Sequence, residues 1–105
     1  MLDTTPLVAT VDRLADRLRA ASQSRLQRGS AAEGLALARE LSVRAQLLES
    51  PGREPRIMPD AGVFAVADQL AVAGHDLAAA LQTASSVELD EAVGLVEAVT
   101  GEVLG

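Results

Sequence analysis

Apolar residues recur at helical spacing in four stretches of the chain, and this periodicity constrains the fold more than any other feature of the sequence. The stretches cover about residues 6–27, 31–49, 61–83 and 86–104. Within each of them Leu, Val and Ala stand three or four positions apart, which places them on one side of an α-helix. No stretch alternates apolar and polar residues as a half-buried β-strand does. The sequence therefore predicts an all-α protein with four amphipathic helices.

Glycine, proline and capping signals predict how these helices are joined. Gly29 can end the first helix, and Ser30–Glu33 and Ser85–Glu88 match the capping box that begins a helix. Residues 50–59 form a longer connection that contains three prolines. Short turns therefore join the helices in two pairs, and one long loop joins the two pairs.

The simplest arrangement of these elements is a compact antiparallel four-helix bundle. We predict one domain over residues 1–105, built from a helical hairpin at about residues 6–49 and a second hairpin at about residues 60–104. At 105 residues and 10.8 kDa the chain is large enough for one hydrophobic core and too small for two. Gly74 falls on the apolar side of the third stretch, which predicts that another helix approaches closely there.

The composition excludes several kinds of site. The chain contains no Cys, so disulfides, thiolate chemistry and Cys-based metal sites are excluded. A single histidine, His75, excludes motifs in which one chain supplies two histidines to a metal. Phe64 is the only aromatic residue, which leaves no platform on which nucleic-acid bases could stack. We therefore predict no cofactor and no enzymatic activity.

Charge is distributed unevenly along the chain. Residues 1–56 contain nine Arg and seven acidic residues, a net charge of +2, whereas residues 57–105 contain eight acidic residues and no Arg or Lys, a net charge of −8. One interpretation is that the acidic half attracts the basic half of a second copy, or a basic partner. The other is that the two halves dock against each other inside one monomer, and this is the interpretation we favour.

His75 is the first residue to consider for chemistry, because histidine can act as a base or as a ligand. Helical spacing puts it near Phe64 and Asp68 at the edge of the apolar side, and these three residues define a candidate ligand-binding edge. Asp68 is seven residues away, about 10.5 Å along the helix axis, which is too far for a hydrogen bond to His75. The simpler interpretation is a boundary histidine that packs its ring and shows one nitrogen to water.

A loose basic stripe on the first helix is a candidate interaction surface. It consists of Arg13, Arg17 and Arg28, and it is interleaved with Asp12 and Asp16. Such a stripe can bind phosphates, as in nucleic-acid recognition. The interpretation we favour is a solvated or internally paired face, because the chain as a whole is acidic.

Ile57 and Met58 in the proline-containing loop are a second candidate surface. Methionine suits adaptable interfaces, so the two residues could contact a partner. The interpretation we favour is that they cover the end of the bundle core.

Together these observations favour a non-enzymatic protein–protein interaction or scaffolding module that associates with itself as a dimer. A small-ligand-binding or regulatory helical domain is the first alternative, and a nucleic-acid accessory protein that uses the Arg-rich first helix is the second. We expect a cytoplasmic protein without a membrane segment. The N-terminus lacks the pattern of a signal peptide, and the longest uncharged stretch has eleven residues, against the roughly 20 that cross a membrane.

Overall fold

Four long helices make up most of the protein. The computed structural model describes residues 1–104. The long helices are α1 (Thr5–Ala20), α3 (Ala31–Glu49), α4 (Val66–Leu81) and α5 (Ser86–Leu104). A short helix, α2 (Gln23–Arg25), and a π-helical turn, η1 (Leu26–Ser30), connect α1 to α3. No β-strand occurs in the described residues, and the predicted all-α four-helix fold is confirmed.

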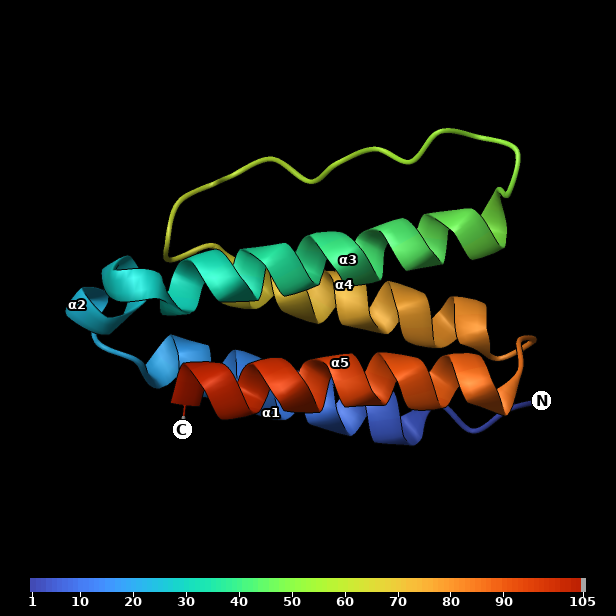
Figure 1. Cartoon of the computed structure of the whole chain (residues 1–105), viewed down its shortest axis with the longest axis horizontal. Helices are drawn as coiled ribbons and strands as arrows, with labels where there is room; N and C mark the ends of the chain where they lie inside the picture. Colours follow the sequence, from blue (N-terminus) through green and yellow to red (C-terminus); the bar gives the residue numbers. More distant parts are fainter. Residues whose placement is uncertain (105) are drawn as a thin grey trace.

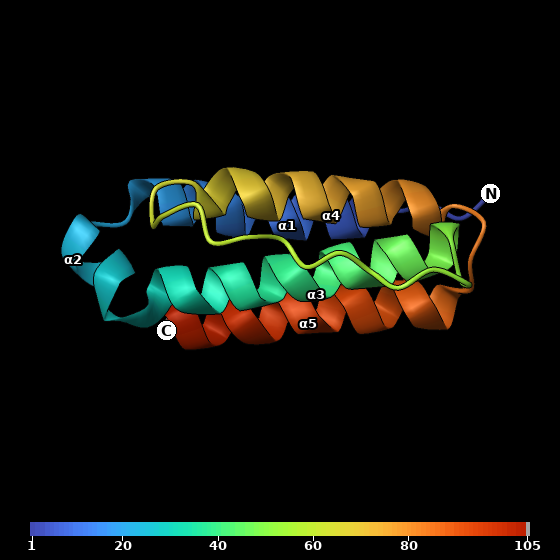
Figure 2. The ribbon, with the colours of Figure 1, turned by 90° about the horizontal axis from the view of Figure 1, so that it is seen from above.

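The helices lie side by side in a bundle with extents of 40 × 26 × 17 Å (Figure 1). α1 runs in one direction, α3 and α4 run in the opposite direction, and α5 returns in the direction of α1 (Figures 1 and 2). The two helices of each predicted hairpin are therefore antiparallel. α3 and α4 are parallel to each other, because the connection at residues 50–65 runs back along the length of the bundle (Figure 1).

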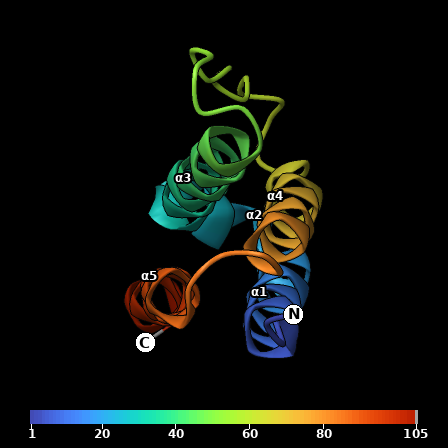
Figure 3. The same cartoon turned by 90° about the vertical axis from the view of Figure 1, so that its right-hand side faces the viewer.

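The two helices of a hairpin are not neighbours in the bundle. Viewed along the bundle axis, α1 and α3 lie at opposite corners, and so do α4 and α5 (Figure 3). Each long helix therefore has its neighbours in the other half of the chain. The most extensive contacts join α3 to α4 and α1 to α4. The hydrophobic core thus forms between the two halves of the sequence.

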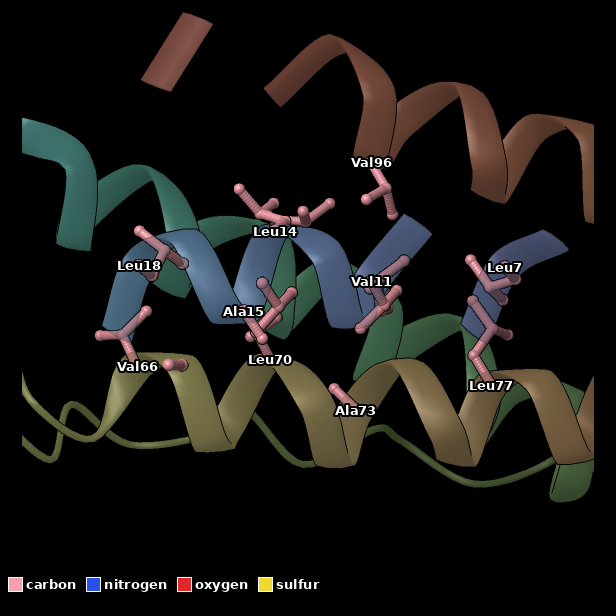
Figure 4. Packing of buried hydrophobic residues seen from close by; sticks show 14 of the residues in the cluster. Leu7, Val11, Leu14, Ala15, Leu18, Val66, Leu70, Ala73, Leu77 and Val96 are labelled. Atoms are coloured by element: carbon pink, nitrogen blue, oxygen red, sulfur yellow. The ribbon is translucent and has the colours of Figure 1, made fainter. Parts of the chain in front are cut away.

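α4 is the central helix of the core. Figure 4 shows α1 laid against it, with Leu7 beside Leu77 and Leu18 beside Val66. A Cβ atom added at Gly74 would lie only 2.5 Å from a γ-methyl carbon of Val11, so the glycine is what lets the two helices come together. The close approach predicted at Gly74 is confirmed.

Arginines of the first half meet acidic residues of the second half at two helix contacts. Arg19 on α1 donates to Asp68 on α4 at 2.8 Å, and this hydrogen bond raises the pKa of the Arg19 guanidinium. Arg44 on α3 lies 3.4 Å from Glu91 on α5. At these contacts the two halves dock against each other inside one monomer, as the favoured interpretation of the charge asymmetry expects.

The first helix is shorter than predicted. α1 ends at Ala20 instead of continuing to residue 27, because Ala21 and Ser22 have extended backbone angles, with ψ of 146° and 153°. The Ser22 hydroxyl oxygen then accepts the backbone N–H of Arg25 at 3.2 Å and begins α2. This break lets the chain cross from the corner of α1 to the opposite corner, where α3 begins.

The capping box predicted at Ser30–Glu33 does not form. Ser30 has helical backbone angles and its side chain makes no capping hydrogen bond, because η1 leads directly into α3. The change of direction lies one residue earlier, at Gly29, whose φ of +144° is in the left-handed region that favours glycine. The glycine was therefore the reliable signal at this turn.

α4 begins at Val66 rather than near residue 61. The Asp60 carboxylate, predicted to cap the helix, instead accepts the N–H of Gly62 at 2.8 Å. Gly62 has a φ of +94°, so these residues form a tight turn in place of the first helical turn. The connection between the hairpins consequently covers residues 50–65 instead of residues 50–59.

Side chains of α3 hold the connection against the bundle. Residues 50–65 pass along α3 and α4 (Figure 2). Arg39 Nε donates to the Met58 carbonyl at 2.8 Å, and the Gln46 amide exchanges two hydrogen bonds of 2.9 Å with the backbone of Arg56. The connection is thus anchored at successive points.

The capping box at Ser85–Glu88 is confirmed and gives a testable prediction. Ser85 Oγ accepts the N–H of Glu88 at 3.3 Å, and Glu88 Oε2 accepts the N–H of Ser85 at 3.1 Å. Replacing Ser85 by Ala should lower the free energy of unfolding by about 1 kcal/mol, the typical effect of losing an N-cap. Ser30→Ala is the matched control, because the Ser30 side chain caps nothing. Urea unfolding should show the larger loss for Ser85→Ala, and equal losses would contradict the assignment.

Candidate functional site

α1 and α5 enclose a groove on one face of the bundle. This face lies on the side away from residues 50–65 (Figure 3). The hollow has a volume of about 690 Å³ and is lined by Pro6, Ala9, Thr10, Arg13 and Arg17 of α1 and by Val93, Glu97, Thr100 and Gly101 of α5. Most of these side chains are small, so the facing helices leave an open hollow here. We call it the α1–α5 groove.

The two walls of the α1–α5 groove carry opposite charges. Arg13 and Arg17 belong to the α1 wall and Glu97 to the α5 wall, and all three residues are exposed. None of the three takes part in an ion pair within residues 1–104. Here the charges of the two halves therefore face each other without pairing, unlike those at the α1–α4 and α3–α5 contacts.

The threonine hydroxyls of the groove are engaged within their own helices. Thr10 Oγ1 donates to the carbonyl of Pro6 at 2.7 Å, and Thr100 Oγ1 donates to the carbonyl of Val96 at 2.7 Å. These bonds to the preceding turn leave each hydroxyl oxygen as an acceptor. The groove therefore offers charge and small apolar surface, a combination suited to recognising another surface.

The structure divides the predicted basic stripe. Arg13 and Arg17 lie together in the α1–α5 groove, as their helical spacing implies. Arg28 lies in η1, in a separate hollow of about 390 Å³ that also contains Glu33 and Glu102. The division follows from the end of α1 at Ala20, because Arg28 no longer continues the same helix.

Ile57 and Met58 lie on the side of the bundle and not at its end. Met58 is half-buried and packs against the core, and its carbonyl accepts from Arg39 in the middle of α3. Ile57 is 63% exposed. The prediction that they cover the end of the core is wrong, because residues 50–65 run along the length of the bundle and place the two residues beside it. Whether Ile57 contacts a partner stays a prediction.

The residues of the predicted ligand-binding edge have different environments. His75 Nε2 lies 2.7 Å from Asp12 Oδ1, a hydrogen bond that joins α4 to α1. Asp68 pairs with Arg19 and not with His75, in agreement with the distance expected along the helix. Phe64 stands on the turn before α4 and is 70% exposed. Ligand binding at this edge stays a prediction.

The contact between His75 and Asp12 should have a small effect on stability. Both side chains are half-exposed, and a polar contact between exposed side chains contributes at most about 1 kcal/mol. His75→Ala is therefore expected to lower the free energy of unfolding by at most about 1 kcal/mol, and Asp12→Ala by a similar amount. The double variant should lose no more than either single variant, because both remove the same contact. Fully additive losses in urea unfolding would argue against the contact.

A second hollow, which the sequence did not single out, lies where α3 and α4 end and α5 begins. It has a volume of about 330 Å³. Its apolar part consists of Leu47, Leu48, Leu77, Leu81 and Ala92, and its polar part of Arg44, Glu88 and Glu91. The adjacent leucines at positions 47 and 48 could have indicated this hollow in the sequence. Two consecutive residues of a helix point in different directions, so they cannot both face the hydrophobic core of the bundle.

Comparisons with known proteins assign no relative. No protein-family model matches the chain, and no curated protein or solved structure matches it. Within residues 1–104, no group of three or more His, Asp or Glu side chains is arranged to hold a metal ion. No helix in that part of the chain is long and apolar enough to span a membrane. The α1–α5 groove and its charges are therefore the basis for assigning a function.

Proposed function

We propose that the protein is a non-enzymatic protein–protein interaction module that associates with itself as a dimer. The observation that carries this proposal is the α1–α5 groove, in which Arg13 and Arg17 stand opposite Glu97 without an ion pair. Charged groups at an interface select a partner and fix its orientation, because like charges brought together are unfavourable. A groove with charges of both signs is suited to such selection.

The packing of α5 supports the proposal. α5 contacts its neighbours less extensively than the other long helices do. Its residues Val93, Leu95 and Val99 are only half-buried against the core. A second protein that covers part of this surface removes apolar area from water, which is favourable by about 25 cal/mol per Å². Binding to the folded state would also stabilise a core that consists of Leu, Ala and Val side chains.

A protein partner fits the arginines of the first half better than a nucleic acid does. Arg13 and Arg17 share their hollow with Glu97, and Arg28 shares its hollow with two glutamates. Carboxylates in these positions repel phosphate groups, and the chain carries a net charge of −6. These charges favour a partner that presents both signs.

Binding of a small apolar ligand is the second candidate function, and the leucine-lined hollow between the ends of α3 and α4 favours it. Leu47 and Leu48 are exposed there, above the buried Leu77 and Leu81. An environment-sensitive apolar dye should bind the wild-type chain and lose its signal in a Leu47→Glu variant. Equal signals from the two chains would exclude this hollow as the binding site.

The mass of the protein in solution tests self-association directly. Light scattering behind size exclusion, with refractive-index detection because the chain lacks Trp and Tyr, should give twice the monomer mass of 10.8 kDa. The mass should fall towards that of the monomer on dilution, as mass action requires. A monomer mass at every concentration would overturn the proposed function.

A further inference from the structure

Helices with arginine and helices without it alternate around the bundle. α1 and α3 contain arginines and lie at opposite corners, whereas α4 and α5 contain none and occupy the other two corners (Figure 3). Ion pairs join neighbours on two sides of this square, between α1 and α4 and between α3 and α5. On the α1–α5 side, Arg13, Arg17 and Glu97 remain unpaired within residues 1–104.

A face with one basic wall and one acidic wall is complementary to a second copy of itself. If a second copy is placed face to face and related by a two-fold axis parallel to the groove, its α1 lies over α5 of the first copy. Arg13 and Arg17 lie one helical turn, about 6 Å, apart along α1 and line the same hollow as Glu97, and the rotation preserves their levels along this axis. The arginines of each copy therefore meet Glu97 of the other. A two-fold dimer requires such an isologous contact.

We infer that two copies of the chain associate in this way, through their α1–α5 grooves, with Arg13 and Arg17 of each copy bound to Glu97 of the other. The inference rests on the proposed self-association and specifies the surface that mediates it. Arginine suits this contact, because its planar guanidinium can donate two parallel hydrogen bonds to one carboxylate. Basic and acidic helices alternate around the axis of each monomer. In the dimer this alternation continues across the interface.

Charge disfavours the other two-fold arrangement of the same faces. A two-fold axis that runs across the groove places α1 over α1 and α5 over α5. Arg13 and Arg17 of one copy would then lie near the same residues of the other, and Glu97 near Glu97. Like charges that face each other at an interface are unfavourable, so the axis parallel to the groove is selected.

The remaining lining residues let the two faces come close. Ala9, Val93 and Gly101 are small or apolar and present little bulk between the charged residues. The hydroxyl protons of Thr10 and Thr100 are already bonded within their own helices, so covering these residues leaves no donor unpaired. The charged residues lie at the exposed rim, where they should also make association sensitive to salt.

Charge reversal on each wall tests the interface. In a homodimer of R17E, the new carboxylate faces Glu97 beside the remaining Arg13, and in a homodimer of E97R the new guanidinium group faces both Arg13 and Arg17. Sedimentation analysis should show that either variant alone has its dimer Kd raised at least about tenfold. An equimolar mixture of the two variants should form a heterodimer with a Kd well below that of either homodimer, because one contact regains the wild-type pairing and the other regains one pair of opposite charges. In that heterodimer each contact again pairs a carboxylate with a guanidinium.

The mixture distinguishes contacts between chains from effects within one chain, because a second variant can restore only an intermolecular pair. Arg53→Glu is the matched control, since it makes the same change of charge at an exposed position in residues 50–65, away from the groove. Its dimer Kd should equal that of the wild type. Circular dichroism should give the same helix content for all three variants.

The outcomes separate this inference from the proposed function. A wild-type chain that stays monomeric at every concentration overturns both. If the wild type forms a dimer and neither R17E nor E97R changes its Kd, the proposed self-association stands and this interface is overturned. Single variants that dissociate and do not reassociate when mixed also overturn the face-to-face pairing. Recovery of the dimer in the mixture supports it.

Discussion

Replacing Leu70 by alanine is expected to lower the free energy of unfolding by about 2–5 kcal/mol. Leu70 is fully buried on α4, the helix that packs against both α3 and α1. Figure 4 places it next to Ala15, a residue of α1 that is itself fully buried. Neighbours on two sides limit how far the structure can collapse into the space that the leucine leaves. The loss is large against the total of about 5–15 kcal/mol that is typical of small domains.

Urea unfolding followed by far-ultraviolet circular dichroism measures this effect, since the chain has no Trp or Tyr for fluorescence. Val72→Ala is the matched control on the same helix, because Val72 is 59% exposed. Its effect should stay within about 0.5 kcal/mol, as is usual for surface positions. A loss for Leu70→Ala no larger than that of the control would contradict the central position of α4.

Replacing Gly74 by alanine is expected to lower the free energy of unfolding by about 1–3 kcal/mol, the usual range for overpacking a core. The added Cβ would lie 2.5 and 2.7 Å from the two γ-methyl carbons of Val11. Val11 is fully buried and β-branched, so its side chain has little freedom to move away. The clash is expected to outweigh the gain of about 0.5–1 kcal/mol that alanine brings to a helix interior.

Two further variants make the result for Gly74 specific. Gly94→Ala places the same methyl group on α5, where no atom of a neighbouring helix lies within 4 Å of it, and should stabilise the protein by about 0.5–1 kcal/mol. In a Val11→Ala background, Gly74→Ala should cost much less, because the atoms that it meets are gone. A cost that is the same with and without Val11 would show that the two residues are not in contact.

Local signals in the sequence predicted the parts of the fold that depend on local structure. The capping box at Ser85–Glu88 forms, and Gly29 has the positive φ expected of a glycine at a turn, although α1 itself ends at Ala20. Gly74 marked a close approach because a glycine on the apolar side of a helix has no side chain to keep a neighbouring helix away. For the capping box and Gly29 the physical cause lies within a few residues of the signal, whereas at Gly74 it is the approach of Val11 on α1.

The ends of two helices could not be predicted from the same signals. Ser22 caps a new helix, α2, and α1 therefore does not continue through it. Gly62 has a positive φ, and α4 therefore does not extend back to residue 61. Both residues lie inside the ranges, about residues 6–27 and 61–83, over which the sequence predicted uninterrupted helices. The break at Ser22 is required by the crossing to the opposite corner of the bundle, and that crossing is a tertiary property.

Only part of the candidate site was accessible from the sequence. The spacing of Arg13 and Arg17 showed that they share one face of a helix, and they do lie together in the α1–α5 groove. Their opposite wall at Glu97 was not predictable, because it depends on which helices become neighbours. The partner of His75 was missed for the same reason, since Asp12 is 63 residues away in the sequence.

The diagonal position of each hairpin has a consequence for how the chain reaches its native state. Neighbouring helices are joined by contacts between distant residues: Arg19 and Asp68 are 49 residues apart, and Arg44 and Glu91 are 47. The two helices of each half make few contacts with each other, so each finds its packing surface only when the other half of the chain arrives. Folding rates fall as the mean sequence separation of native contacts rises. We therefore expect the protein to fold more slowly than up-and-down bundles of its size, with the encounter of its two halves as the rate-limiting event.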